Sequence, residues 1–217
     1  MPSAIKQTLS APPVPEMPTP GAQYSEATLR TSNGLLRTFM RKLTAGLQAL
    51  FGPAGGQYID NPNGLFFSTA SQTPAAVNTG YPVTFNQTYL NNYVSVVDSS
   101  KFTVAIGGVY NFQYTGSVQS TSSSAKNIFF WIVRNGTTIG YSCAPYTLSG
   151  SGTYGRVAWN FSIDLDANEY VQIYWGASDT TVSLTTVAAS APYPAIPAGI
   201  CAVMYSSALP TTRPTAP

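Results

Sequence analysis

The sequence predicts an all-β head of the sandwich or jelly-roll kind, preceded by an extended arm and one short α-helix. Between Phe66 and Tyr205, apolar and polar residues alternate in short runs, the pattern of half-buried β-strands. Turn signals such as Asn135-Gly136 separate these runs, and the runs show no helical periodicity. Short strands at this spacing are typical of β-sandwiches and jelly rolls.

We divide the chain into four parts. Residues 1–23 form a Pro-rich arm, because repeated proline favours extended polyproline geometry over helix. Residues 24–56 hold the helix and its linker, residues 57–208 form the head, and residues 209–217 are a Pro-rich tail. The arm is either a disordered tail or a segment that docks on a neighbouring subunit.

A helix is expected from Thr28 to Phe51. Its leucines and its methionine follow a heptad seam, in which Asn33 is the one polar layer. Gly52-Pro53 ends it. The helix packs on its own domain, forms an intersubunit bundle or docks on a partner, and we expect it to anchor the protein. The expected anchoring residues are Leu36, Met40, Leu43, Leu47 and Leu50.

Two predicted strands of the head do not alternate. The segment Ile128–Val133 is apolar on both faces, and Tyr170–Gly176 is similarly rich in aromatic residues. Because the outer face of a sheet should be polar, we expect a neighbouring subunit to cover these strands. An aromatic ligand cleft is the alternative. The expected trimer-interface residues are Phe129, Trp131, Val133, Tyr170, Tyr174 and Trp175.

The composition limits the chemistry that we expect. Charged residues make up 8% of the 217 residues, the net charge is +2, and histidine is absent. Without histidine, the side chain most often used as a general base at neutral pH is missing. The weak net charge gives little attraction to nucleic acid or anionic membranes. A chain with so little charge is poorly protected against aggregation as a free monomer, so we expect it to form part of an assembly.

No catalytic or metal-binding pattern is found. Asp164 and Asp166 form the one close carboxylate pair of the head, which we interpret as part of a solvated turn, with a calcium site that includes Glu169 as the alternative. Cys143 and Cys201 lack metal-ligand spacing and are expected to be buried free thiols or, alternatively, a disulfide. We therefore expect no enzyme, no metal and no cofactor.

Signals for secretion or membrane insertion are also missing from the sequence. Residues 2–23 have no apolar core of a signal peptide, and no apolar run approaches the length of a membrane span. We expect synthesis in a cytoplasm without secretion.

Two resemblances add to these inferences. Gly108-Val109-Tyr110-Asn111-Phe112 resembles a strand of the trimeric jelly rolls of the complement and tumour-necrosis-factor type, and Leu165–Val171 resembles the turn into a late strand of that superfamily. Asn63–Thr73, Tyr81–Asn86 and Pro194–Ile200 resemble virion proteins of tailed bacteriophages such as cyanophages and pelagiphages. The second resemblance implies a homotrimeric jelly-roll head fixed to the particle by its N-terminal region.

The expected function is that of a bacteriophage virion structural protein. Residues 1–56 would bind capsid or tail subunits, and the trimeric head would act as a short tail or head fibre or as a capsid cement (decoration) protein. In a fibre, loops at 146–154 and 178–181 would contact the host surface, including its glycans, through Tyr146, Tyr154 and Asp179. A soluble trimeric jelly-roll lectin that binds glycans is the alternative. We expect no nucleic-acid or membrane partner.

Overall fold

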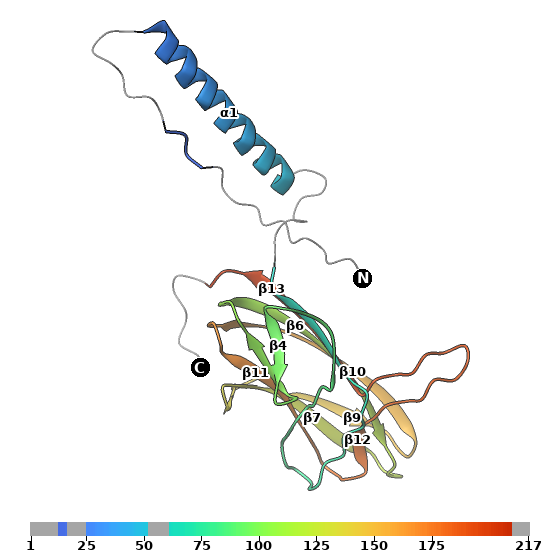
Figure 1. The fold of residues 1–217 in the computed structure, drawn as a ribbon. Coiled ribbons are helices and arrows are strands. Elements are labelled where there is room, and N and C mark those ends of the chain that lie inside the picture. The colour runs from blue at the N-terminus through green and yellow to red at the C-terminus, as the bar shows by residue number, and fades with distance from the viewer. Residues whose placement is uncertain (1–12, 17–24, 52–60, 210–217) are drawn as a thin grey trace. The chain divides into compact units, whose positions relative to one another are not determined.

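The computed structural model describes residues 13–16, 25–51 and 61–209 (Figure 1). The chain divides into two units, residues 1–60 and residues 61–217. Most of the predicted arm and tail lies outside the described residues. No helix in the described part of the chain is long and apolar enough to cross a membrane.

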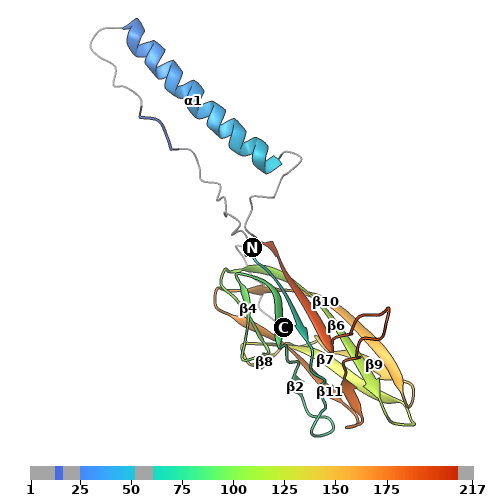
Figure 2. The same cartoon turned by 45° about the vertical axis from the view of Figure 1, so that its right-hand side comes forward.

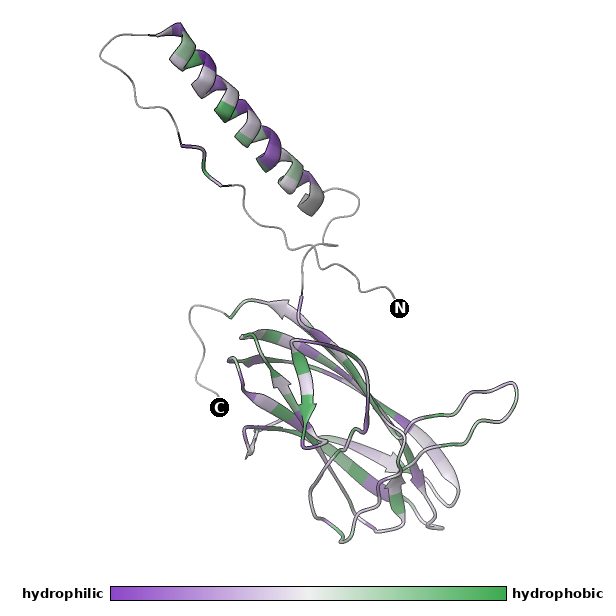
Figure 3. Ribbon diagram, viewed as in Figure 1, coloured by the Kyte–Doolittle hydropathy of each residue, from purple (hydrophilic) through white to green (hydrophobic). Residues whose placement is uncertain are grey.

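The N-terminal unit contains the helix α1 (Glu26–Phe51), which confirms the predicted helix and begins two residues earlier. Ser25 caps it, since its hydroxyl accepts a 3.5 Å hydrogen bond from the amide of Thr28. Glu26 in the first turn pairs with Arg30 at 2.6 Å. Figure 3 shows apolar and polar residues alternating along the helix. The side chain of Leu50 lies outside the described residues.

The head is a sandwich of two antiparallel sheets (Figures 1 and 2). In the first sheet the order is β10, β6, β13, β1 and β3, and β12 also pairs with β6. Its strands are β1 (Asn63–Ser68), β3 (Gln87–Asn92), β6 (Gly108–Ser120), β10 (Thr153–Leu165), β12 (Val182–Leu184) and β13 (Gly199–Ser207).

In the second sheet the order is β4, β5, β11, β7 and β8, while β2 pairs with β11 and β9 with β7. Its strands are β2 (Tyr81–Pro82), β4 (Val94–Val97), β5 (Lys101–Val104), β7 (Lys126–Arg134), β8 (Thr137–Thr138), β9 (Ala144–Leu148) and β11 (Tyr170–Ala177). The first strand of the head lies beside the last, and the two sheets together confirm the predicted all-β jelly-roll sandwich.

The core between the sheets is aromatic. The ring of Phe102 lies edge-on to those of Phe66, Phe85 and Phe112, with centroid distances of 5.6, 4.9 and 5.8 Å. Tyr110 is fully buried among them, and its hydroxyl donates a hydrogen bond to the carbonyl oxygen of Ile106. Burial raises the pKa of Tyr110 to about 12. These contacts make the head a self-contained unit.

The region after β7 shows why one predicted strand fails. Asn135 and Gly136 both have positive φ angles, 47° and 81°, and form the predicted tight hairpin turn between β7 and β8. The sequence also predicts a strand from Thr138 to Cys143, but the observed strand ends at Thr138. Tyr141 turns the chain with a φ of 58°, and the hydroxyl of Ser142 accepts a 3.1 Å hydrogen bond from the Ile132 amide. A side chain thus replaces the backbone partner at that position.

Candidate functional site

The expected interface residues fall into two groups, because adjacent strand residues face opposite sides of a sheet. On β7, Ile132 faces the core, whereas Phe129 and Trp131 face outward and are half-buried. On β11, Tyr174 faces outward, but Trp175 is 1% exposed and belongs to the core. The expectation that Trp175 lies at a subunit interface is therefore wrong.

The chain itself covers part of the outward aromatic face. Trp131 stacks obliquely on Tyr174 with ring centroids 5.9 Å apart. A Cβ atom at Gly80 would lie 2.6 Å from the Trp131 ring, so this segment passes directly over the tryptophan. We expected a neighbouring subunit as the cover; the segment that leads into β2 supplies part of it instead. Val133, at 4% exposure, has little surface left for a partner.

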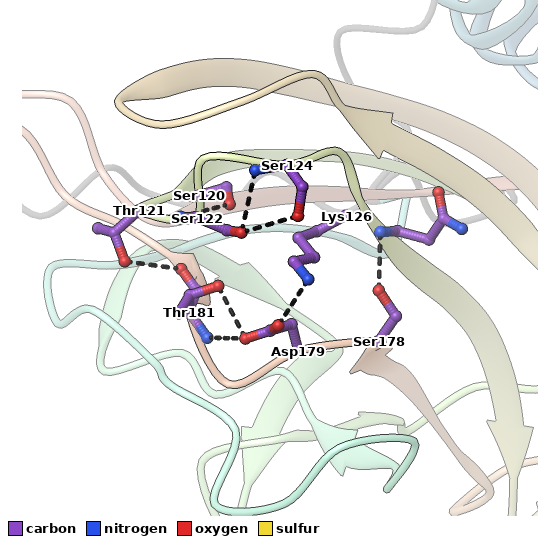
Figure 4. Close-up of polar contacts among 9 residues, drawn as sticks. Ser120, Thr121, Ser122, Ser124, Lys126, Ser178, Asp179 and Thr181 are labelled. Carbon is purple, nitrogen blue, oxygen red and sulfur yellow. Dashed lines mark hydrogen bonds and ion pairs between the residues drawn. The ribbon is translucent and has the colours of Figure 1, made fainter.

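Three loops gather at the end of the head that lies opposite the point where the chain enters it. The amide of Tyr205 donates to the carbonyl of Pro62 near the start of β6, whereas these loops surround Ser120, the last residue of β6. We call them the distal loops: residues 121–125, 149–152 and 178–181 (Figure 4).

Backbone hydrogen bonds tie the distal loops together. The amide of Thr121 donates to the carbonyl of Thr181 at 3.1 Å, and the amide of Gly152 donates to the carbonyl of Ser120 at 2.8 Å. The hydroxyl of Ser178 accepts from the amide of Asn127 at 2.9 Å. Serine side chains add local bonds, because the Ser122 hydroxyl accepts from the Ser124 amide at 3.3 Å. The loops therefore form one ordered surface rich in hydroxyl groups (Figure 4).

Asp179 holds this surface together. Its Oδ2 lies 2.8 Å from Nζ of Lys126, and its Oδ1 accepts bonds from the amide and the hydroxyl of Thr181 at 3.0 and 2.8 Å. The bond from Lys126, followed by the bonds from Thr181, lowers the pKa of Asp179 to about 2. The carboxylate thus fixes the shape of the loop, and a direct contact of Asp179 with a host stays a prediction.

The other two expected contact residues do not lie on a loop. Tyr146 belongs to β9 and is half-buried against the core, with its hydroxyl close above Gly155. Tyr154 belongs to β10 and is 59% exposed on the outer face of the first sheet. The loop expected over 146–154 is thus only residues 149–152, since β9 and β10 take up the rest.

A hairpin projects beside the outer face of the first sheet. Val187 and Ile196 exchange two backbone hydrogen bonds of 2.9 Å, and Ser190 and Tyr193 pair near the tip. In Figures 1 and 2 this orange-red segment extends away from the sandwich. Two shallow depressions of about 500 and 410 Å³ share Val187 and Ile196, and Phe67 and Ile200 help to line the larger one. Apart from the alanine and proline content of this segment, no sequence pattern indicates the apolar surface.

The acidic cluster of the head is structural. Glu169 bonds Arg134 and Asn135 at 2.6 Å each and accepts the amide of Asp166 at 2.8 Å. Burial alone would raise the pKa of Glu169, but the bonds from the Asp166 amide, Arg134 and Asn135 outweigh it and lower that pKa. Asp164 also lies 3.7 Å from Arg134. In the described residues no group of three metal-ligating side chains is close enough to hold an ion, so the calcium alternative gains no support.

The cysteines are unpaired and differ in environment. Cys201 is buried in β13, and burial raises the pKa of its thiol. Cys143 is exposed, because it follows the turn at Tyr141 rather than lying in a strand. The expectation of a buried thiol is therefore correct for Cys201 and wrong for Cys143.

No family model matches the sequence, and no curated protein matches it. Among solved structures, the chain is similar to the globular domain of zebrafish complement 1qA protein, with 15% sequence identity and a TM-score of 0.41. The match covers 67% of this chain and 96% of that chain. The jelly-roll assignment of the head itself rests on the strand order of its two sheets.

Proposed function

We propose that this protein is a homotrimeric virion structural protein of a tailed bacteriophage, held on the particle through residues 1–56. The contrast between its two units is the observation that carries the proposal. The head encloses a large buried core of its own, whereas Leu36, Met40 and Leu47 of α1 are 45–51% exposed. A helix with an exposed apolar stripe needs a partner, and the head does not depend on it for a core.

The sequence resemblance supports the virion part of the proposal. The segments that carry it lie in β1, in β2 and the residues after it, and in the residues that lead into β13. The test is mass spectrometry and immunogold microscopy of density-purified particles from the organism that encodes the chain. Peptides of this chain in the particle band, with gold on the particle surface, are expected. Their absence from pure particles would refute the proposal.

Within the virion, we propose the role of a short fibre whose distal loops meet the host surface. These loops are ordered, exposed and rich in hydroxyl groups, which suits hydrogen bonding to polyhydroxylated host glycans. Ser123→Arg with Thr180→Arg places two bulky charges on exposed positions of this surface. Loss of adsorption by intact particles is expected. Normal adsorption would instead favour the role of a capsid cement protein.

The trimer would bury the outward aromatic side chains of the second sheet. Phe129, Trp131, Tyr170 and Tyr174 are half-buried in the single chain and remain available to a partner. Sedimentation of the full chain is expected to give three times its mass of 23.0 kDa. Phe129→Asp should shift this species towards the monomer, because it places a charge in a desolvated contact. Tyr89→Asp on β3 of the first sheet is the matched control, since that aromatic side chain is 78% exposed and lies outside the second sheet.

A soluble glycan-binding lectin is the second candidate, and the exposed tyrosines of the head favour it. Tyr89, Tyr141 and Tyr193 are 73–99% exposed, and tyrosine rings stack well on sugars. A glycan array with the full chain separates the two candidates. Selective glycan binding by a protein absent from particles would favour the lectin.

A further inference from the structure

The apolar stripe of α1 has the spacing of a coiled-coil seam. Steps of four and three residues alternate without a break along the helix. The seam residues are Leu29, Asn33, Leu36, Met40, Leu43, Leu47 and Leu50. In heptad terms Leu29, Leu36, Leu43 and Leu50 take d positions, and Asn33, Met40 and Leu47 take a positions.

The N-terminal unit leaves this seam uncovered. Leu29, Leu36, Met40 and Leu47 are 40–51% exposed. In the head, by contrast, Leu148, Leu165 and Leu184 are at most 1% exposed. The chain can therefore bury leucine fully where it has a partner surface, and the described residues of the N-terminal unit offer none to the seam.

Asn33 indicates which partner fits. It lies between Leu29 and Leu36 in the seam, so any close partner desolvates its amide. In a parallel, in-register bundle of identical helices, Asn33 meets Asn33 of each neighbour, and the amides can bond one another. In an antiparallel pair it would face the leucines near the other end and lose its partner. A second copy of this chain thus supplies the matching polar group automatically.

The charges on α1 are compatible with the parallel arrangement. Arg30 and Arg37 take e positions, and Arg30 is already paired with Glu26 of its own helix. In a parallel bundle, Arg37 lies opposite the g position of a neighbour, which is the uncharged Ser32. In an antiparallel pair e faces e, which brings arginine-bearing edges together. Repulsion between these arginines therefore acts against the antiparallel form.

We propose that α1 forms a parallel, in-register coiled coil with the α1 helices of two other copies, and that Asn33 fixes its register. The number of copies rests on the trimer of the proposed function. The direction and register rest on α1 alone. In that case, residues of the N-terminal unit outside the seam would bind the other virion protein.

Disulfide trapping tests direction and register in the full chain. Cys143→Ser removes the exposed native thiol, and Met40→Cys places a new thiol at an a position of the seam while Asn33 stays in place. Mild oxidation is expected to link two of every three chains as a reducible dimer, independently of protein concentration. Ala45→Cys, at the outward f position, is the matched control and should remain unlinked. Equal linking of the two variants would overturn the proposal.

A mixing experiment tests the antiparallel alternative directly. Leu29→Cys and Leu47→Cys chains, distinguished by a tag, are unfolded, mixed and refolded in the Cys143→Ser background. The parallel bundle predicts links within each variant and none between them. Links only between the two variants would place the helices antiparallel and overturn the proposal.

A third experiment tests whether Asn33 selects a single assembled state. Asn33→Leu should raise the melting temperature of the assembly and broaden its sedimentation from one species to several, because a polar a residue selects one state at a cost in stability. Thr38→Leu, at an outward position, should change neither. An Asn33→Leu variant that matches Thr38→Leu in both measurements would remove Asn33 from the seam.

These results separate the inference from the proposed function. Absence of trapping in a protein that sediments as a trimer and is found on particles would reject only the coiled coil. Efficient trapping in a protein that is absent from particles would reject only the virion role.

Discussion

The two units of this protein differ in whether their main apolar surface is buried. The head closes two sheets over an aromatic core in which Phe102 and Trp175 are at most 1% exposed. The helix α1 leaves leucine and methionine half-exposed along one stripe. The head is thus stabilised by its own contacts, whereas α1 carries apolar surface that the described part of its own unit does not bury. This difference separates folding from assembly along the chain, and four experiments test it.

The largest effect is expected in the head core. Phe102→Ala removes a ring that contacts three others and should lower the free energy of unfolding by about 3–5 kcal/mol. Chemical denaturation, followed by tryptophan fluorescence, measures it. Tyr89→Ala is the control, because Tyr89 is 78% exposed and its loss should be nearly neutral. Similar losses for both variants would contradict a self-contained head core.

In α1, the loss of seam leucines should weaken the association of copies rather than the stability of the head. Leu36→Ala with Leu47→Ala is expected to weaken association by about tenfold for each leucine, because the apolar area buried between copies shrinks. Unfolding of the head should stay unchanged. Sedimentation over a dilution series measures the association. Leu35→Ala, which lies off the seam, should leave association intact, and a loss as large as that of the double variant would argue against the seam.

A smaller effect is expected at the β7–β8 turn. Gly136 has a φ of 81°, which L-residues adopt only with strain, so Gly136→Ala should cost about 1 kcal/mol of stability. Gly140→Ala is the matched control, because a Cβ atom there meets nothing within 4 Å and its φ is not in the positive range. The two melting temperatures, measured side by side, give the comparison. If Gly140→Ala proves the more costly, the turn geometry is wrong.

The smallest change in stability is expected from a substitution in the distal loops, and this change should depend on pH. Because the pKa of Asp179 is lowered from 3.8 to about 2, its ionised form stabilises the fold above about pH 4. That contribution is lost as the pH falls through 2. The Asp179→Asn variant should therefore have a lower melting temperature than the wild type at pH 6. The difference between the two melting temperatures should narrow between pH 4 and pH 2. A difference that is constant down to pH 2 would mean that the carboxylate is not held by Lys126 and Thr181.

The sequence predicts the periodic parts of this molecule well. Alternation revealed the long strands of the head, and the heptad spacing revealed α1. Strict use of the two-residue period would also have placed Trp175 opposite Tyr174, in the core. The strand β3 escaped prediction because its residues, Gln87–Asn92, are largely polar and exposed and owe their structure to a neighbouring strand. The strand β9 escaped it because it is short and contains Pro145, which argues against a strand.

The candidate site was only partly accessible from sequence. The segment 178–181 was identified by its turn residues, but its union with 121–125 and 149–152 depends on long-range hydrogen bonds such as that between Thr121 and Thr181. The cover over Trp131 depends on the absence of a side chain at Gly80. Neither feature has a local pattern, because each joins segments that are distant in the chain.

The adjacency of β1 and β13 makes the head a convenient display platform. The chain enters beside Tyr205, and Leu209 ends the described residues against Gly107, so entry and exit share one end of the sandwich. A cargo fused directly after Leu209 would thus emerge at the end where the chain enters and leave the opposite end unobstructed. A peptide spliced between Gly150 and Ser151, by contrast, would be presented at that opposite end, where an antibody could reach it.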